Sequence, residues 1–471
     1  MSSFSGLSTA LSSLVAQRQA LEVSGQNISN VNTAGYTRQR ANLTAVQALS
    51  APSMHSSRTM AGNGVNVTSL TRMGDVFLDA RVRAETSNAS FQAARATAFS
   101  RLESTISEPT STGLASQLQR FWTGWQDVGN KTDDAAARNV LLGDANALVD
   151  QIASGYRAVE TQWNQLRTET ETLVTEVNTT ASAVARLNES IRGITVSGGS
   201  ANELIDQRNE LVTKLSALVG ATGRERADGT MDVMVAGNAL VRGVKANAIE
   251  AAGAFTMSAA TADTAQQVRL AWTGTPPTSL TLEGGKLASH VANLAPDGML
   301  DKAAKSWNGI AKALHETVNP VHMTGHGLDG AAGRQFFALV VGEPEAISLS
   351  VAITDPDHIG AGAVGEGDYD GSIADKISQL STVTGGPDEA WRSFVVDLGV
   401  QTRAAGQRAD VSEVSRATAQ NLQLSQSSVD LDEEMVSMLA YQRAYEGAAR
   451  VLTTIDQMLD VLINRTGVVG R

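Results

Sequence analysis

The nine prolines of this 471-residue chain leave three long segments free of proline. None occurs before Pro52, between Pro109 and Pro276, or after Pro387. Proline inside a helix removes a backbone hydrogen bond and clashes with the preceding turn, so these three segments can form long helices. The chain also exceeds the usual size of one hydrophobic core. The sequence therefore predicts either several domains or one elongated helical body with insertions.

Apolar side chains recur at helical spacing in the first of these segments. They step by threes and fours, with interruptions at Arg18 and Gly25. The stripe consists of Phe4, Leu7, Leu11, Leu14, Leu21 and Ile28. Residues at this spacing share one face of a helix. We expect a helix of roughly 40 Å whose apolar face is an assembly interface.

The last proline-free segment carries a stronger stripe, close to the seam of a coiled coil. Its members are Leu431, Met435, Met438, Gln442, Tyr445, Ala449, Leu452, Ile455, Leu459 and Leu462. Asp430 can cap the start of this helix, and Glu433 stands three residues later. Asp432 and Glu434 complement the positive end of the helix dipole. We expect the apolar members of this stripe to form a second assembly interface.

Helical and β-type patterns alternate between the two ends. Helical spacing dominates from about Gly113 to Leu218, with Gly198 and Gly199 as the break, and strands follow the turn at Asp228. The order of the patterns places both ends of the chain in one mainly α body with β insertions. We predict a terminal assembly domain at 1–45 and 425–471, a helical body at 46–220, 286–319 and 371–424, a β-rich insertion at 221–285, and a Gly-rich, partly β insertion at 320–370.

The composition removes several kinds of chemistry. The chain has no cysteine, and its formal charge of −12 without a basic stripe argues against a nucleic-acid partner. Two G-x-G-x-x-G matches lack the strand and helix that a nucleotide site needs. His322 and His326 could bind a metal from one helix face, but nearby glycines favour solvated loop histidines. We predict no catalytic residue, no metal and no cofactor.

Membrane and targeting patterns are also missing from the sequence. No apolar run reaches the length of a membrane span, so we expect no membrane insertion. The first residues show neither the basic region nor the continuous apolar region of a cleaved signal peptide. If the protein leaves the cell, we expect another export route.

Two segments at opposite ends resemble the signatures shared by flagellar rod, hook and hook-associated proteins. The first follows N-I-x-N-x-x-T-x-G-Y-x-R, at Asn27, Ile28, Asn30, Thr33, Gly35, Tyr36 and Arg38. The second includes Glu433, Glu434, Met435, Gln442, Tyr445 and Met458. The interior stretches 113–149 and 202–219, followed by the Asp-Gly hairpin, resemble the helical body of the hook-filament junction members of this family.

The resemblance implies a structural subunit of the bacterial flagellum at the junction of hook and filament, or alternatively another axial protein of hook or rod. It implies terminal helices in a coiled-coil layer around a central channel, a helical-bundle body around that layer, and β-rich modules pointing outward. It also implies self-association in a ring-like layer, with hook protein below and a second junction protein and flagellin above. The resemblance further implies an export chaperone that binds the carboxy-terminal helix. It also implies export to the extracellular flagellum through the flagellar type III apparatus, without a cleaved signal peptide.

The physical chemistry of the terminal stripes agrees with assembly. Ordering a residue costs roughly 1–2 kcal/mol, and no other part of the chain is expected to cover either stripe. We therefore expect both terminal segments to be mobile in the monomer and to find their apolar partner in neighbouring subunits.

Two other classes of function fit parts of the pattern. A signalling or scaffolding coiled coil would explain the long helices, but it would have no need of the turn motif at 27–38. An enzyme housed in the β insertions would need an acid–base pair or a nucleophile there, and the sequence offers none.

Overall fold

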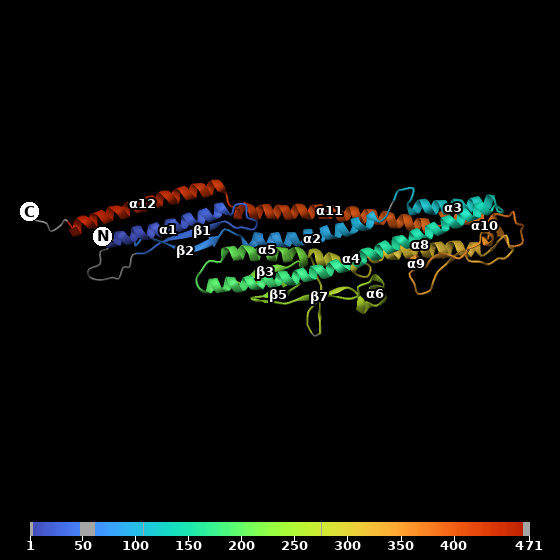
Figure 1. Ribbon diagram of the computed structural model, residues 1–471, viewed down its shortest axis with the longest axis horizontal. Coiled ribbons are helices and arrows are strands. Elements are labelled where there is room, and N and C mark those ends of the chain that lie inside the picture. Colours follow the sequence, from blue (N-terminus) through green and yellow to red (C-terminus); the bar gives the residue numbers. More distant parts are fainter. Residues whose placement is uncertain (1–2, 48–61, 107, 275, 465–471) are drawn as a thin grey trace, which may run out of the picture.

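The structure, a computed structural model, describes residues 3–47, 62–106, 108–274 and 276–464. It is an elongated helical bundle, with α1 (Ser3–Ser29) and α12 (Leu431–Asn464) together at one end (Figure 1). Small antiparallel sheets lie along the bundle. The predicted fold class, mainly α with β insertions, is confirmed.

In the part of the chain that the structure describes, eight further helices build the body between the terminal helices and the far end. They are α2 (Val76–Ser104), α3 (Leu114–Asn130), α4 (Ala135–Val196), α5 (Asn202–Val219), α7 (Gly285–Leu294), α8 (Met299–His322), α10 (Ser372–Ser378) and α11 (Pro387–Ser427). The 62-residue helix α4 begins at its cap Asp134 and ends just before Gly198, whose φ of 80° favours glycine. The predicted break at Gly198 and Gly199 is therefore confirmed.

Helices α2 and α11 pack side by side in opposite directions. Near one end of the pair, Gln423 donates to Asp79 at 2.6 Å. The buried side chains of α11 step by seven residues: Trp391, Leu398, Ala405, Ser412 and Ala419. Three of these five are small, so the two backbones approach closely and only a narrow stripe of α11 is covered.

Two apolar cores fill the body. The first joins α3, the first half of α4 and α8, and includes Trp125, Trp163 and Phe336. The second joins the last half of α4 and α5 to the strands after Gly220, and includes Val177 and Val233. The β elements thus pack on the helices and share their cores.

The strands of the described ranges form five small sheets. Those of the first insertion are β3 (Thr222–Glu225), β4 (Met231–Val235), β5 (Asn238–Arg242), β6 (Lys245–Ala246), β7 (Ile249–Ala252), β8 (Arg269–Trp272) and β9 (Thr278–Leu280), with α6 (Met257–Ala262) and η1 (Thr264–Gln266) after β7. The second insertion holds β10 (Gly325–His326), β11 (Phe337–Ala338), α9 (Glu345–Ser348), β12 (Ser350–Val351), η2 (Pro356–His358) and β13 (Gly362–Ala363), and η3 (Gln379–Thr382) follows α10. The predicted hairpin turn at Asp228 is confirmed, because β3 and β4 pair around it.

One hairpin was not expected from the sequence. Strands β1 (Gln39–Ala45) and β2 (Val65–Arg72) pair in antiparallel register, with a bulge at Asn42. Only Gln39 and Ala41 of these two strands are buried, and the strands lack a long run of alternating apolar side chains. Side-chain hydrogen bonds to the body hold this hairpin instead, as described below.

The interpretation of His322 as a solvated loop residue is wrong. Helix α8 continues past Pro320 as far as His322, and this carries the ring into the core beside Trp125. The His322 Nε2 accepts the Gly360 N–H at 2.9 Å, and its Nδ1 lies 2.8 Å from the Arg334 carbonyl. The ring is therefore neutral, with its proton on Nδ1, and it ties two loops of the second insertion to α8.

Acid should destabilise the first core through His322. Burial lowers the pKa of His322 to about 4 from an ordinary value of 6.5. Between these two values the unfolded chain binds a proton that the folded chain does not, so the free energy of unfolding falls as the pH falls from about 6.5 to 4. The loss should reach about 3 kcal/mol for this group.

Denaturation followed by tryptophan fluorescence at pH 7.5 and pH 4.5 measures this loss. We expect His322→Gln to lose less stability on acidification than the unmodified chain. The control His315→Gln, on the half-buried surface of α8, should keep the full acid sensitivity. Equal acid sensitivity in His322→Gln and the unmodified chain would contradict the assignment.

Candidate functional site

The two terminal helices lie against each other in opposite directions. A Cβ atom added at Gly6 on α1 would stand 3.1 Å from the side chain of Ile455 on α12. The buried positions of α1 are small or polar: Ala10, Ala16, Ala20, Ser24 and Asn27. Leu452, Ile455 and Leu459 of α12 are half-buried. The expectation that neither stripe has a partner within the chain is therefore wrong, because each helix covers part of the other.

The predicted assembly residues of α1 lie at the edges of this contact. Leu7, Leu14, Leu21 and Ile28 are half-buried, and Leu11 is 55% exposed. The side chain of Phe4 lies outside the described residues.

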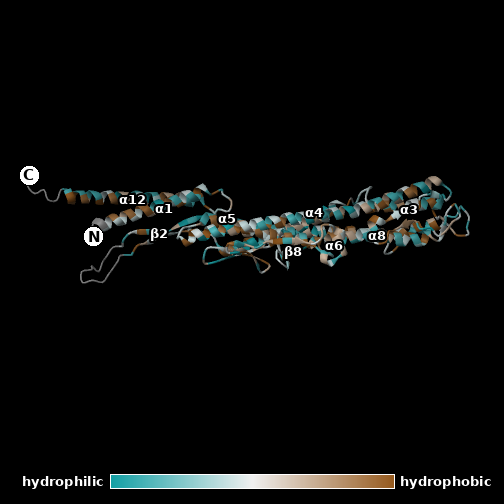
Figure 2. Ribbon diagram, turned by 60° about the horizontal axis from the view of Figure 1, so that its bottom comes forward, coloured by the Kyte–Doolittle hydropathy of each residue, from teal (hydrophilic) through white to brown (hydrophobic). Residues whose placement is uncertain are grey.

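Helix α12 leaves much more apolar surface open. Leu431, Met435, Tyr445 and Leu462 are exposed, Met438 is half-buried, and only Glu434 is buried outright. Figure 2 shows apolar residues recurring along α12. Large apolar side chains exposed in such number on one helix mark a contact with another molecule.

The amino-terminal signature folds into a tight polar turn between α1 and β1. Asn27 donates from Nδ2 to the Gln39 carbonyl at 2.8 Å, and its Oδ1 accepts the Gln39 N–H at 3.0 Å and the Tyr36 hydroxyl at 2.8 Å. Thr33 donates to the Asn30 side chain at 3.1 Å. Gly35 has a φ of 76°, which a larger residue would adopt only with strain. The signature residues thus set the angle at which the chain leaves α1.

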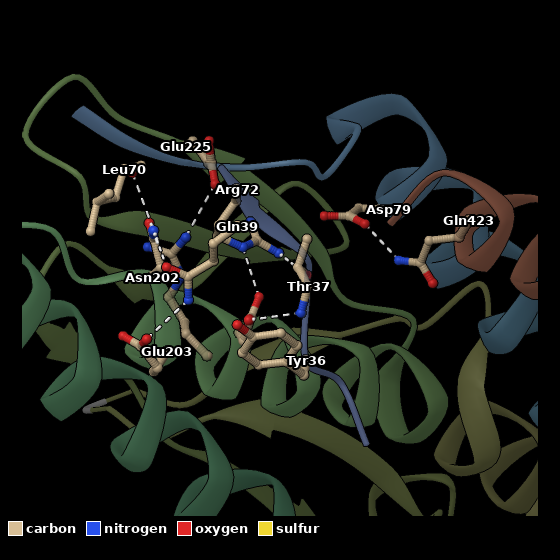
Figure 3. A network of polar contacts seen from close by, with 12 residues as sticks. Tyr36, Thr37, Gln39, Leu70, Arg72, Asp79, Asn202, Glu203, Glu225 and Gln423 are labelled. Carbon is tan, nitrogen blue, oxygen red and sulfur yellow. Dashed lines mark hydrogen bonds and ion pairs between the residues drawn. The ribbon is translucent and has the colours of Figure 1, made fainter. Parts of the chain in front are cut away.

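The turn is anchored to the start of α5. The Thr37 N–H donates to Asp206 at 3.0 Å, and Arg72 binds the same carboxylate at 2.7 Å (Figure 3). The Gln39 side chain accepts from Asn202 at 2.9 Å and donates to Glu203 at 2.9 Å. Three side chains at the start of α5, Asn202, Glu203 and Asp206, therefore hold the hairpin on the body.

Arg38 links the same turn to the carboxy-terminal helix. Its guanidinium binds Glu433 at 2.6 Å and Glu434 at 2.7 Å, and its backbone N–H donates to the Ser427 carbonyl at 2.9 Å. Asp430 accepts the N–H groups of Asp432 and Glu433, so the predicted cap of α12 is confirmed. Arg38 thus contacts the end of α11 and the start of α12 together.

We call the contacts of the 27–39 turn with α5, α11 and α12 the joint. Neither apolar core of the body includes a residue from α1, β1, β2 or α12. A cavity of about 270 Å³ lies beside Arg38, between α1, β1 and α12. The joint is therefore held mainly by hydrogen bonds and ion pairs.

The local charges match this arrangement. Burial opposes the charge on Arg38, but its hydrogen bonds with Glu433 and Glu434 raise the pKa of the guanidinium overall. Burial raises the pKa of Asp206, and Arg72 and Thr37 offset part of that effect. Burial, followed by the charge of Glu203, raises the pKa of Tyr36 to about 12, so Tyr36 remains a hydrogen-bond donor.

No sequence pattern pointed to the side chains that anchor the turn to the body. Gln39, Arg72, Asn202, Glu203 and Asp206 carried no motif of their own, although three of them lie in the stretch 202–219 that resembled the junction proteins. Gln442, a predicted signature residue, is exposed on α12 and stands outside the joint.

No group of three or more His, Asp and Glu residues in the described ranges is placed to hold a metal ion. No described helix is long and apolar enough to cross a membrane.

Removing the Arg38 charge should loosen the start of α12. Arg38→Met would leave the Glu434 carboxylate, whose side chain is 3% exposed, without its cation. Such a loss should cost about 2 kcal/mol locally and speed backbone hydrogen exchange in the first turns of α12 roughly thirtyfold. Arg18→Met removes an exposed ion pair on α1 and should change exchange little. Unchanged exchange in Arg38→Met would show that Arg38 does not hold α12.

Comparisons with known proteins agree with this geometry. The model of the flagellar hook-associated protein FlgK helical domain matches residues 99–337, just over half of the chain. The model of the flagella basal body rod protein matches residues 7–37, and that of the flagellar basal body rod FlgEFG protein C-terminal region matches residues 420–465.

Whole-chain relatives extend the match. Flagellar hook-associated protein 1 of Bacillus subtilis is 29% identical, and the alignment covers all of both chains. The protein of the same name from Escherichia coli is 27% identical over 97% of this chain and 99% of its own length. The flagellar hook junction protein FlgK from Burkholderia pseudomallei has a similar fold, with a TM-score of 0.64 and 16% identity, over 74% of this chain and 100% of its own. The chain therefore belongs to the flagellar hook-associated protein FlgK family.

Proposed function

We propose that this chain is the subunit that joins the flagellar hook to the filament and that it assembles through α1 and α12. The observation that carries the proposal is the apolar surface left open on this helix pair. Met435, Val436 and Met458 are 55%, 70% and 61% exposed, although the helix that carries them is long and well formed. Copies of the chain packed around a common axis would bury these side chains.

The same proposal accounts for the partners. A ring-like layer of copies would have hook protein below it, and a second junction protein and flagellin above it. An export chaperone that covers the exposed face of α12 would keep the free chain soluble. Delivery to the extracellular flagellum would use the flagellar type III apparatus.

The proposal also assigns a different role to each part of the chain. The terminal segments 1–45 and 425–471 would assemble, the helical body would surround them, and the insertions 221–285 and 320–370 would face outward. The role is structural and needs no catalytic residue, metal or cofactor.

Location is the direct test of the proposal. We expect immunogold labelling of intact flagella to place the chain at the boundary between hook and filament. A strain without the chain should make hooks and release flagellin into the medium. Label along the hook, or in the rod, would favour the alternative of another axial protein.

A charge placed on the open face of α12 should block assembly without unfolding the chain. Met435→Asp changes an exposed residue, so the melting temperature of the purified chain should stay within about 2 °C. In the layer the same carboxylate would be buried without a partner, which costs several kcal/mol for each copy. Filaments should therefore be lost while export continues.

Met435→Leu, which keeps an apolar side chain of similar volume, is the matched control and should support swimming. A normally motile Met435→Asp strain would contradict the assembly role of this face. Leu452→Asp differs from both, because Leu452 lies against α1, and it should also loosen the helix pair.

A further inference from the structure

Helix α11 exposes a row of valines that nothing in the described chain covers. Val396, Val400, Val411 and Val414 are 60%, 63%, 67% and 67% exposed. Their spacing of 4, 11 and 3 residues places them on one face of the helix, over a length of roughly 27 Å. A groove of about 390 Å³ runs beside the first two valines. This valine face lies on the body, apart from the α1–α12 pair.

Helix α4 exposes an uncharged stripe of matching length. Its members are Thr161, Gln165, Thr168, Thr172, Thr175 and Thr179, and all are exposed. The five threonine hydroxyls donate to carbonyls one turn earlier in α4, at 2.8 to 3.3 Å. The hydroxyls are thus satisfied within the helix, and the stripe can be covered without losing hydrogen bonds. We call it the threonine stripe.

The two faces lie at the same height along the bundle. The side chain of Glu103, at the end of α2, lies 3.9 Å from a Cβ atom added at Gly399 on α11. Gln162 of α4 donates to the Ala98 carbonyl, also near the end of α2, at 2.9 Å. Helix α4 runs opposite to α2, so Gly399 of α11 is level with about residue 157 of α4, and Val411 is level with about Thr168. Helix α2 lies between the two helices.

Both helices also run in the same direction. The Ser427 carbonyl at the end of α11 binds Arg38, and Ser200, just after α4, donates to the Leu70 carbonyl of β2. Each helix therefore runs toward the joint, α11 along one side of the bundle and α4 along the other (Figure 1). Copies placed side by side with the same polarity would bring the valine face of one beside the threonine stripe of the next.

Charges beside the two faces are complementary. Arg392 and Arg403 stand exposed on the valine side of α11, and neither forms an ion pair with another residue that the structure describes. Asp150, exposed on the same side of α4 as Thr168, likewise has no ion pair within the described part of the chain. Counting along the two helices from the contacts above places Arg392 level with Asp150 of a neighbouring copy.

We propose that the valine face of α11 docks on the threonine stripe of α4 in a second copy of this chain. The contact joins two different surfaces, so it repeats from copy to copy and does not stop at a dimer. This inference rests on the proposed function, because it assigns the lateral contact within the layer.

The absence of cysteine allows a direct test in the full chain. A variant with both Val411→Cys and Thr168→Cys would be expressed in place of the native chain, and isolated flagella would be oxidised. We expect a ladder of cross-linked multimers on a non-reducing gel, because a disulfide needs Cα atoms within about 7 Å. Reducing agent should collapse the ladder to a single band.

Three controls define the contact. Either cysteine alone should give no cross-link. Val411→Cys combined with Ser154→Cys should also give none, since Ser154 lies on the same side of α4 but roughly 21 Å from Thr168.

The outcomes separate the two proposals. Dimers from Val411→Cys alone would show a symmetric contact and overturn the inference. A doubly substituted chain that labels at the hook–filament boundary but gives no ladder would overturn the inference alone. A chain absent from that boundary would overturn the proposed function and, with it, the inference.

Discussion

The ion pairs of Arg38 are the contact on which the arrangement of the termini depends. Arg38 follows directly from the turn that begins at Asn27, and it reaches Glu433 and Glu434 at the start of α12. Without this contact, α12 would be attached to the body only by the short link after Ser427 and by its seam with α1. A partly buried ion pair adds little net stability compared with apolar packing, but it forms only when the two charged groups are correctly placed. Arg38 therefore fixes where α12 starts and in which direction it runs.

The joint is polar, whereas the surfaces proposed to contact other copies are apolar, and the two kinds of contact have different physical properties. The joint uses Asn27, Thr37, Arg72 and Asp206, whose hydrogen bonds are directional and tolerate only one arrangement. The faces proposed to meet other copies use aliphatic side chains, whose burial is favourable in many arrangements and scales with area. The joint thus sets orientation within one chain, and the apolar faces supply the affinity between chains.

The sequence predicted elements whose cause is local and missed those whose cause is distant. The proline-free segments, the break at Gly198 and the cap Asp430 depend on neighbouring residues, and all three could be read from the chain. The pairing of α1 with α12 depends on Arg38 meeting Glu434 across 396 residues, which spacing cannot reveal. His322 was misjudged for a related reason, because its burial is decided by Gly360 and Trp125, far from it in sequence. The polar hairpin β1–β2 gave no strand pattern because distant side chains hold it.

The residues buried between α1 and α12 indicate how much of the apolar surface of these helices is used within the chain. Within the chain, α1 buries Ala10, Ala16 and Ala20, and alanine removes little apolar area from water. A fully buried leucine or methionine contributes about 1.5–3 kcal/mol, and these larger side chains, such as Leu11 and Met435, stay largely exposed. The contact between the two helices is therefore weak relative to what their outer surfaces can gain. When α1 and α12 pair within the chain, most of their large apolar side chains stay in water. The free energy of burying these side chains is gained only when other molecules cover the helix pair.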